Sequence, residues 1–277
     1  MKQTWLITGC SSGLGRSIAW AVLRRGWNAV VTARHTQTLA AFQAEFPESA
    51  LVLPLDLTDR RAIHDAVQTA KEHFGAIDVL VNNAGYGYRA AVEEGEDEAV
   101  RRLFATNFFG PADLIHAVLP DMRMRRQGAI VNVSSVAALE TAPGSGYYGA
   151  SKCALEGMSN ALLKEVGPLG IKVMVVEPGA FRTDFAGRSL TQAQTPIADY
   201  AETAGKRRIE HDDTHGTQPG DPDKGAELIL DAVSSENTPF RLLLGSDAVA
   251  LADSVYAARV QEINNWRTQS CGTDFNA

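Results

Sequence analysis

The chain is poor in the features that mark secreted, membrane-bound and nucleic-acid-binding proteins. It has 3 cysteines in 277 residues, and Cys10, Cys153 and Cys271 show no CxxC spacing, so we predict reduced thiols instead of disulfides or a thiolate zinc site. No apolar run is long enough to span a membrane, and no signal-peptide segment precedes the first apolar run. The net charge of −7 argues against nucleic acid or an anionic membrane as a partner. We therefore expect a cytoplasmic protein.

Metal-binding patterns are also scarce. His211 and His215 are four residues apart with carboxylates between them, which is the only arrangement that resembles a metal site. They lie in a polar stretch closed by Gly216 and Pro219, where a stable helix is doubtful. We expect no metal.

Glycine, by contrast, is abundant, and its placement near the N-terminus is informative. An apolar run, Trp5–Ile7, is followed by a glycine-rich turn and then by helical periodicity from Arg16 to Arg25. Glycines let the backbone approach a pyrophosphate, and the free N–H groups at a helix start favour an anion. The alternative is a tight turn without a ligand. The residues expected to bind a dinucleotide here are Thr8, Gly9, Ser11, Ser12, Gly13, Leu14 and Gly15.

The end of the second apolar run, Asn28–Ala33, bears on which dinucleotide is bound. NAD-specific folds place a carboxylate there for the ribose 2′-hydroxyl, whereas an arginine accommodates the 2′-phosphate of NADP. This chain has Ala33 followed by Arg34 and no carboxylate. We expect NADP(H), with NAD(H) possible if Arg34 is an ordinary surface residue.

Strand-like and helical patterns then alternate. We expect strands at Ala50–Leu55, Ile77–Val81, Ala129–Val133 and Ile171–Val176, and helices at Arg61–Phe74, Ala99–Phe109, Ala112–Met124 and Tyr147–Val166. This alternation predicts a single α/β domain with a doubly wound parallel sheet and a site at the carboxyl ends of its strands.

A candidate catalytic group lies in one of these helices. Tyr148 and Lys152 are four residues apart and so share a helix face, where a cation can lower the pKa of a phenol. Ser135, delivered from a separate segment, can hold the oxygen of a carbonyl or alcohol. Taken alone, the Tyr–Lys pair is better explained as an ordinary helix-surface pair, because short motifs often match by chance.

Six separated motifs together resemble the short-chain dehydrogenase/reductase family in its shorter form. They are Thr8-Gly9-xxx-Gly13-x-Gly15, Asn82-Asn83-Ala84-Gly85, Asn107, Ser135, Tyr148-xxx-Lys152 and Pro178-Gly179-xxx-Thr183. The resemblance implies a Rossmann-type fold over the whole chain.

The family pattern also implies a role for each matching residue. Tyr148 is then the general acid or base, Lys152 lowers its pKa and binds the nicotinamide ribose, Ser135 orients the substrate oxygen, and Asn107 holds a relay water. Ser12 departs from the pattern, because NADP-using relatives often have a basic residue there, and Arg16 is a weaker substitute. The remaining cofactor contacts that the family implies are Asp56, Leu57, Asn83, Ala84, Gly85, Pro178, Gly179 and Thr183.

Beyond the core at 1–183, the segment 184–223 is polar and follows Pro178-Gly179, so we expect a substrate lid. Tyr86, Tyr88, Phe181 and Phe185 either wall an apolar pocket or anchor loops in the core. The remainder, 224–277, is expected to form a helix, a strand and a helix that ends near Ala257.

The sequence thus predicts an NADP(H)-dependent oxidoreductase for a small carbonyl or secondary alcohol. The alternatives are an NAD-dependent alcohol dehydrogenase and a cofactor-binding regulator without turnover. The resemblance also implies a homodimer or homotetramer that pairs the helix bearing Tyr148 and the helix preceding Asn132. Residues available for a core face and a partner face are Ala150, Ala154, Leu155, Met158, Ala161, Leu162 and Leu163.

Overall fold

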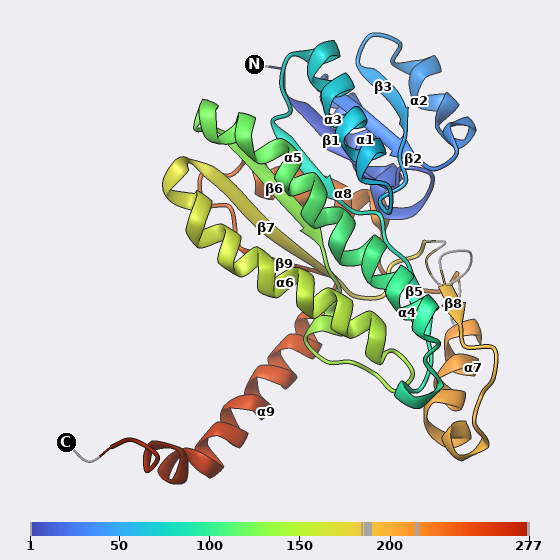
Figure 1. Cartoon of the computed structure of the whole chain (residues 1–277), viewed down its shortest axis with the longest axis vertical. Helices are drawn as coiled ribbons and strands as arrows, with labels where there is room; N and C mark the ends of the chain where they lie inside the picture. The colour runs from blue at the N-terminus through green and yellow to red at the C-terminus, as the bar shows by residue number, and fades with distance from the viewer. Residues whose placement is uncertain (1, 184, 186–189, 214–215, 276–277) are drawn as a thin grey trace.

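A seven-stranded parallel sheet forms the centre of the molecule (Figure 1). The computed structural model describes residues 2–183, 185, 190–213 and 216–275. The strand order is β3-β2-β1-β4-β6-β7-β9, so the order reverses between β1 and β4 and creates a crevice at the carboxyl ends. The strands are β1 (Thr4–Ile7), β2 (Asn28–Ala33), β3 (Ala50–Pro54), β4 (Val79–Asn82), β6 (Gly128–Val133), β7 (Ile171–Pro178) and β9 (Arg241–Leu244).

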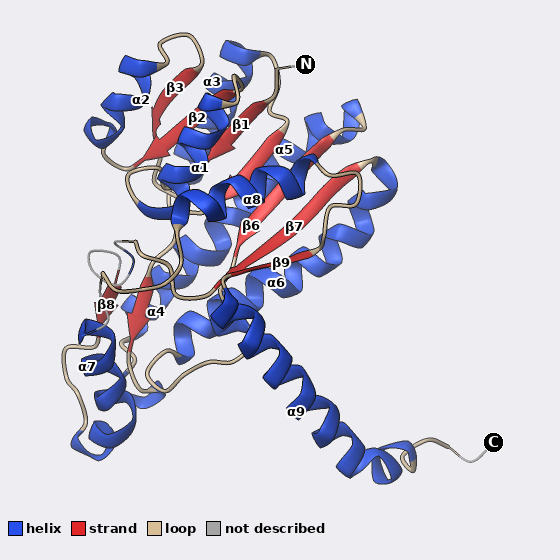
Figure 2. Ribbon diagram, turned by 180° about the vertical axis from the view of Figure 1, so that it is seen from behind, coloured by secondary structure: helices blue, strands red, loops and turns tan. Residues whose placement is uncertain are grey.

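Helices cover both faces of this sheet, and each face has its own apolar core (Figures 1 and 2). Side chains alternate along β1, so Trp5 and Ile7 enter one core and Leu6 the other. One face carries α1 (Gly13–Arg24), α2 (Ala40–Glu45) and α8 (Pro222–Ser234), and the other carries α3 (Arg60–Phe74), α5 (Gly110–Arg125) and α6 (Gly146–Val166). The predicted doubly wound α/β fold is confirmed.

The helix before β6 is longer than the two helices expected there. α4 (Asp97–Phe104) continues through a π-helical turn at Ala105–Phe109 directly into α5. Asn107 lies inside this turn, and Gly110 follows it against Leu57. The helical path therefore shifts its phase at the residue that the site uses.

Two parts of the chain lie outside the sheet layers. A two-stranded parallel sheet pairs β5 (Gly87–Arg89) with β8 (Leu190–Gln192), next to α7 (Lys206–Asp213). The last helix, α9 (Ser246–Cys271), projects from the body (Figure 2) and runs well beyond the predicted end at Ala257. In the described part of the chain, none of the helices combines the length and the apolar character that crossing a membrane requires.

Candidate active site

Helix α6 places Tyr148 and Lys152 one turn apart on the face that looks toward β6. Lys152 is 4% exposed, and its Nζ lies 5.8 Å from the centroid of the Tyr148 ring. Gly149, between them, is packed so closely on Thr141 that a Cβ would lie 2.2 Å from Thr141 Oγ1. The two side chains are therefore brought together, as the sequence predicted.

Ser135 joins them from the carboxyl end of β6. Its side chain accepts a hydrogen bond from the Ala137 N–H at 3.1 Å, which fixes the turn after the strand. The same hydroxyl lies close enough to the Tyr148 phenol to lower its pKa. A serine, a tyrosine and a lysine thus converge where a substrate oxygen can meet both hydroxyls.

The pKa of Tyr148 differs from the sequence-based expectation. Burial raises the pKa of its phenol to about 12, and the nearby Ser135 hydroxyl only partly opposes this rise. The predicted lowering by Lys152 is wrong for this structure, because desolvation dominates. Tyr148 is therefore a protonated donor at neutral pH.

Lys152 is held by the backbone of the neighbouring strand. Its Nζ donates a 2.8 Å hydrogen bond to the Val133 carbonyl. Burial lowers the pKa of this ammonium to about 8, and the carboxylate of Glu156, one turn further along α6, opposes the change. Lys152 remains mainly charged at neutral pH.

Asn107 is 1% exposed, and the π-helical turn directs its amide into the site. Its Nδ2 donates to the Tyr86 carbonyl at 3.0 Å and to Ser151 Oγ at 3.1 Å, and its Oδ1 accepts from the Tyr86 N–H. A Cβ at Gly85 would lie 3.1 Å from Asn107 Oδ1 and 3.5 Å from Lys152 Nζ. Asn107 and Lys152 thus face the same glycine, while the predicted water relay remains a prediction.

The glycine turn after β1 has the shape that a pyrophosphate requires. Gly9 and Gly13 have φ angles of +73° and +58°, which L side chains rarely adopt. A Cβ at Gly15 would lie 2.2 Å from Asn83 Nδ2. α1 begins at Gly13, and Ser12 makes no side-chain capping bond, so the first N–H groups of a 12-residue helix stay available for an anion.

Thr8 and Asn83 brace this turn. Thr8 Oγ1 accepts hydrogen bonds from the N–H groups of Asn83 and Ala84, both at 2.9 Å. Asn83 Nδ2 donates back to the Thr8 carbonyl at 2.8 Å. These two predicted cofactor residues therefore tie the end of β1 to the end of β4.

Arg34 is exposed at the end of β2, directly after the buried Ala33. No ion pair or hydrogen bond joins it to a described residue, so its guanidinium is available for a ligand. Asp56 lies close enough to feel its charge, although the pKa of Asp56 is lowered first by the hydrogen bond from the Thr58 N–H. Leu57 is buried against Gly110. Arg34 and Asp56 therefore flank one edge of the crevice.

The loop after β7 forms the opposite edge of the crevice at the carboxyl ends of the strands. Gly179 N–H donates to the Leu244 carbonyl at 2.9 Å, and Ala180 N–H donates to Asp247 Oδ2 at 2.7 Å. Thr183 lies against the glycine turn, because a Cβ at Gly13 would be 3.2 Å from its Cβ. Sequence reasoning missed Asp247, whose only signal was a carboxylate in the first turn of a helix after Gly245.

The four aromatic residues divide between the site and the core. Phe185 packs on Tyr148 with ring centroids 5.6 Å apart, and Tyr86 is half-buried beside Asn107. Tyr88 is buried and accepts a hydrogen bond from the Glu96 N–H, while Phe181 packs on the core that contains α1 and α8. Only Phe185 and Tyr86 are thus placed to meet a substrate.

Part of the predicted lid is firmly attached. The buried carboxylate of Glu94 accepts hydrogen bonds from the Ile197 N–H and the Ala91 N–H, both at 2.8 Å, and pairs with Arg208. Despite its burial, the pKa of Glu94 is lowered by these partners. The segment 190–213 is therefore pinned to the turn before α4, and sequence reasoning did not identify this anchor.

The doubted helix near His211 is present, since α7 extends to Asp213. The side chain of His211 and the whole of His215 lie outside the described residues, as does Asp184. Among the residues that are described, no group of His, Cys, Asp and Glu side chains is arranged to hold a metal ion.

Two buried glutamates lie under the site, and sequence reasoning also missed them. Glu156 Oε1 accepts a 2.6 Å hydrogen bond from Ser134 Oγ, and burial raises the pKa of Glu156. Glu177, before Pro178, is 1% exposed, and burial together with the charge of Glu156 raises its pKa to about 7. Arg241 Nε lies 3.2 Å from Glu177 Oε1 and opposes this rise.

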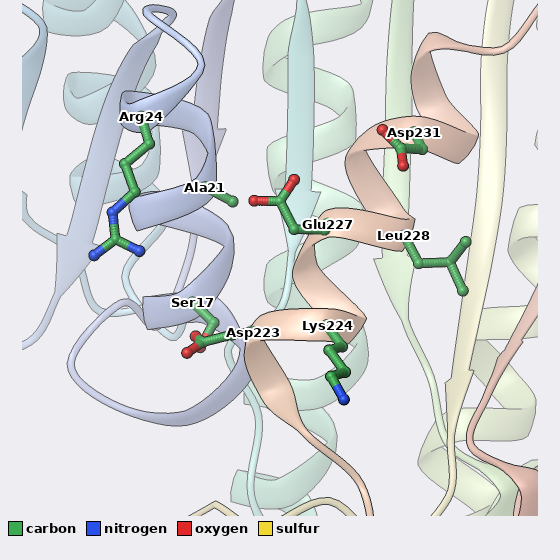
Figure 3. A pocket seen from close by; sticks show the side chains of 8 residues that line it. All are labelled: Ser17, Ala21, Arg24, Asp223, Lys224, Glu227, Leu228 and Asp231. Carbon is green, nitrogen blue, oxygen red and sulfur yellow. The ribbon is translucent and has the colours of Figure 1, made fainter.

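A surface groove of about 410 Å³ lies apart from these residues, between α1 and α8 (Figure 3). Arg25 forms ion pairs with Glu227 and Asp231 beside it. None of the predicted site residues lines the groove, so we do not assign catalysis to it. Its lining residues are Ser17, Ala21, Arg24, Asp223, Lys224, Glu227, Leu228 and Asp231.

Comparison with known proteins agrees with this geometry. The sequence model of the short chain dehydrogenase family matches residues 3–194. The curated oxidoreductase BOA17 of Botryotinia fuckeliana is 36% identical over 271 residues, which cover 98% of each chain.

Solved structures show the same similarity. A short-chain dehydrogenase from Streptomyces avermitilis superposes with a TM-score of 0.93 at 41% identity, covering 99% of this chain and 98% of that one. A short-chain dehydrogenase from Sphingobium yanoikuyae, solved in complex with NADPH, superposes with a TM-score of 0.73 at 28% identity, covering 95% of both chains.

Proposed function

This chain belongs to the short-chain dehydrogenase family, an oxidoreductase of the CH–OH/C=O class with a nicotinamide cofactor, and on that premise we propose that it is an NADP(H)-dependent carbonyl reductase or alcohol dehydrogenase. The observation that carries the proposal is the convergence of Ser135, Tyr148 and Lys152 at the carboxyl end of β6. The bound nicotinamide supplies or accepts the hydride, and the protein supplies the proton.

We assign the proton transfer to Tyr148. Its phenol is protonated at neutral pH, so in the reducing direction its O–H gives a proton to the carbonyl oxygen as hydride reaches the carbonyl carbon. Ser135 holds the same oxygen through its hydroxyl. The reverse direction returns the alcohol proton to the Tyr148 oxygen.

Lys152 and Asn107 support this step. The ammonium of Lys152 is charged at neutral pH and lies beside Gly85, where it can hold a ribose hydroxyl. Asn107 fixes the Tyr86 backbone next to it through two hydrogen bonds. We assign Asn107 to the proton path toward Lys152, as the family resemblance implies.

The chain's own residues fit the phosphates of a dinucleotide. Positive φ angles at Gly9 and Gly13 and the missing Cβ at Gly15 leave backbone N–H groups at the start of α1 open to the pyrophosphate. Ala84 and Asp56 would hold the adenosine of the cofactor, and Gly179 and Thr183 would hold its nicotinamide carboxamide.

We assign the preference for NADP(H) to Arg34. Its guanidinium pairs with none of the described residues and follows Ala33, so a 2′-phosphate meets a cation and no opposing carboxylate at the end of β2. A charge-assisted contact of this kind is worth about 1.5–3 kcal/mol. We expect NADPH to be favoured over NADH by roughly tenfold to a hundredfold in kcat/KM.

The decisive experiment is steady-state kinetics with NADPH and NADH over a panel of ketones and secondary alcohols. Ala33→Asp together with Arg34→Ala should reverse the preference, because the new carboxylate repels a phosphate and accepts from ribose hydroxyls. Arg61→Ala, an exposed arginine on α3, is the matched control. If the wild-type chain uses NADH as well as or better than NADPH, the NAD-dependent alcohol dehydrogenase is favoured instead. Absence of turnover with either cofactor would favour the non-catalytic regulator.

We also propose a homo-oligomer through α5 and α6. Leu155 and Leu162 on α6 are buried in the core, whereas Ala150 and Ala161 are exposed on its outer side. An outer face of small residues lets two helices approach closely. Light scattering of the purified chain tests this, and a monomeric mass at micromolar concentration contradicts it.

A further inference from the structure

Helix α9 packs on the body only at its beginning. Ala248, Ala252 and Val255 are buried, and Arg259 hydrogen-bonds the Leu139 carbonyl. From residue 256 to residue 275, every residue is exposed. Figures 1 and 2 show this outer part of α9 extending away from both layers of the fold.

The exposed part of α9 carries an ordered apolar seam. Tyr256, Val260 and Ile263 follow the alternating spacing of four and three residues that places side chains on one helix face, and Val249 begins the same row. Val260 is 55% exposed and Ile263 is 58% exposed. Trp266 lies beside this row and is also exposed.

A helix of this kind needs a partner. An isolated helix of about 12–15 residues is marginal in water, and most helices in proteins are stabilised by packing one face. The structure from Streptomyces avermitilis covers nearly all of this chain, so α9 falls largely within the matched region. The projecting helix is thus part of the shared fold, with its seam turned to solvent in the single chain.

The charges at the two ends of the seam indicate what the partner is. Asp253 precedes Tyr256 in the row, and Arg267 follows Ile263 at the same spacing. If two α9 helices run antiparallel with Val260 opposite Ile263 of the other copy, Arg267 of each meets Tyr256 of the other and comes within reach of its Asp253. The seam is therefore complementary to its own reversed copy, as an isologous two-fold contact requires.

We propose that α9 is an assembly arm, which pairs antiparallel with α9 of a second copy of this chain through Val260 and Ile263. This contact is separate from the one proposed for α5 and α6, and two different two-fold contacts can generate a tetramer.

A membrane surface fits the arm less well than a second copy. Helices that lie on anionic lipid carry many lysines and arginines on their polar face. Between Tyr256 and Cys271 the arm has 2 arginines and no lysine, and its polar face consists mainly of Asn, Gln and Thr. Arg267 lies in the seam itself, where its guanidinium donates hydrogen bonds to Asn264 Oδ1 of the same helix.

Thiol cross-linking tests the contact and its register. The background chain has Cys153→Ser and Cys271→Ser, which remove the exposed thiols and leave Cys10 buried. We expect a mixture of Val260→Cys and Ile263→Cys chains to form a covalent dimer at least about tenfold faster than Ala258→Cys chains, whose cysteine lies on the opposite helix face. Equal rates for all three, or no cross-linking, would overturn the proposal.

Self-association of the full chain gives an independent measurement. Val260→Asp with Ile263→Asp should weaken it by about a hundredfold, because carboxylates then face each other in the seam. Ala258→Asp with Asn265→Asp adds the same charge on the opposite face and should leave it unchanged. Arg267→Asp should weaken association by about tenfold, and adding Asp253→Arg should restore it.

Circular dichroism on each variant checks that α9 still forms, since all of these positions are exposed. A chain that is monomeric by light scattering overturns the proposal, whether or not it floats with anionic phospholipid vesicles. An oligomer whose mass is insensitive to all of the seam substitutions also overturns it, because assembly would then use other surfaces.

Discussion

Replacing Glu177 by glutamine should remove a pH dependence of stability from this protein. Glu177 lies at the end of β7 with almost no exposure, next to Glu156 and 3.2 Å from Arg241 Nε. Its pKa is raised to about 7, whereas an ordinary glutamate titrates near 4.3. The folded protein therefore binds a proton that the unfolded chain releases in this range.

The sign of the effect follows from this difference. Stability from the raised pKa is fully present below the ordinary glutamate pKa and is lost as pH rises through about 7. At about 1.4 kcal/mol for each pKa unit, the loss is roughly 2–3 kcal/mol between about pH 5 and about pH 8. The pKa of Lys152 is lowered to about 8, so its contribution to the free energy of unfolding changes mainly at pH values above this window.

Urea unfolding at several pH values from about 5 to about 8 measures this directly. The free energy of unfolding of the wild type should fall with pH relative to Glu177→Gln, which keeps the shape of the side chain but cannot ionise. Glu165→Gln, at an exposed position on α6, is the control that should run parallel to the wild type. Parallel curves for wild type and Glu177→Gln would refute the argument that burial keeps this carboxyl protonated.

The remaining predictions concern the candidate active site and the attached segment 190–213. Tyr148→Phe should abolish turnover while NADPH binding, followed by fluorescence titration, stays nearly intact, and turnover within a few-fold of wild type would remove Tyr148 from proton transfer. Lys152→Ala should reduce both turnover and cofactor affinity, so an unchanged dissociation constant would argue against its ribose contact. Glu94→Gln should speed hydrogen exchange in residues 190–213 and raise KM, because Arg208 loses its ion-pair partner. The exposed Glu98→Gln on α4, whose partner is Arg102, is the control, and unchanged exchange in Glu94→Gln would show that other contacts hold the segment.

Local patterns in the sequence predicted the sheet and most of the site. The apolar runs around Leu6, Val30, Leu80, Val131 and Val175 are all strands, because buried parallel strands give continuous apolar segments whose ends carry the loops. The same logic placed Ser135 after β6, and helical spacing placed Tyr148 and Lys152 on one face.

Features that depend on distant residues were not predictable in this way. Glu94 and Arg208 are far apart in the sequence and meet only in the folded chain, where β5 also pairs with β8. The raised pKa of Tyr148 depends on how closely the surrounding elements pack, which no spacing reveals. The sequence prediction ended α9 near Ala257, well before its actual end at Cys271. The outer half of this helix does not pack on a core, so it lacks the broad apolar face by which helices are predicted.

The π-helical turn at Ala105–Phe109 makes this helix sensitive to the insertion or deletion of a single residue. The helix must point Asn107 into the site and, a few residues later, must bury Leu114, Ile115 and Val118 in the core. One uninterrupted α-helical phase, at about 100° per residue, does not serve both directions, and the wider turn absorbs the extra residue. Deleting one residue here would let a regular helix form, yet it would rotate Asn107 away from Tyr86 or turn the apolar face of α5 from the sheet. The deletion would thus make the helix more regular and the enzyme less active.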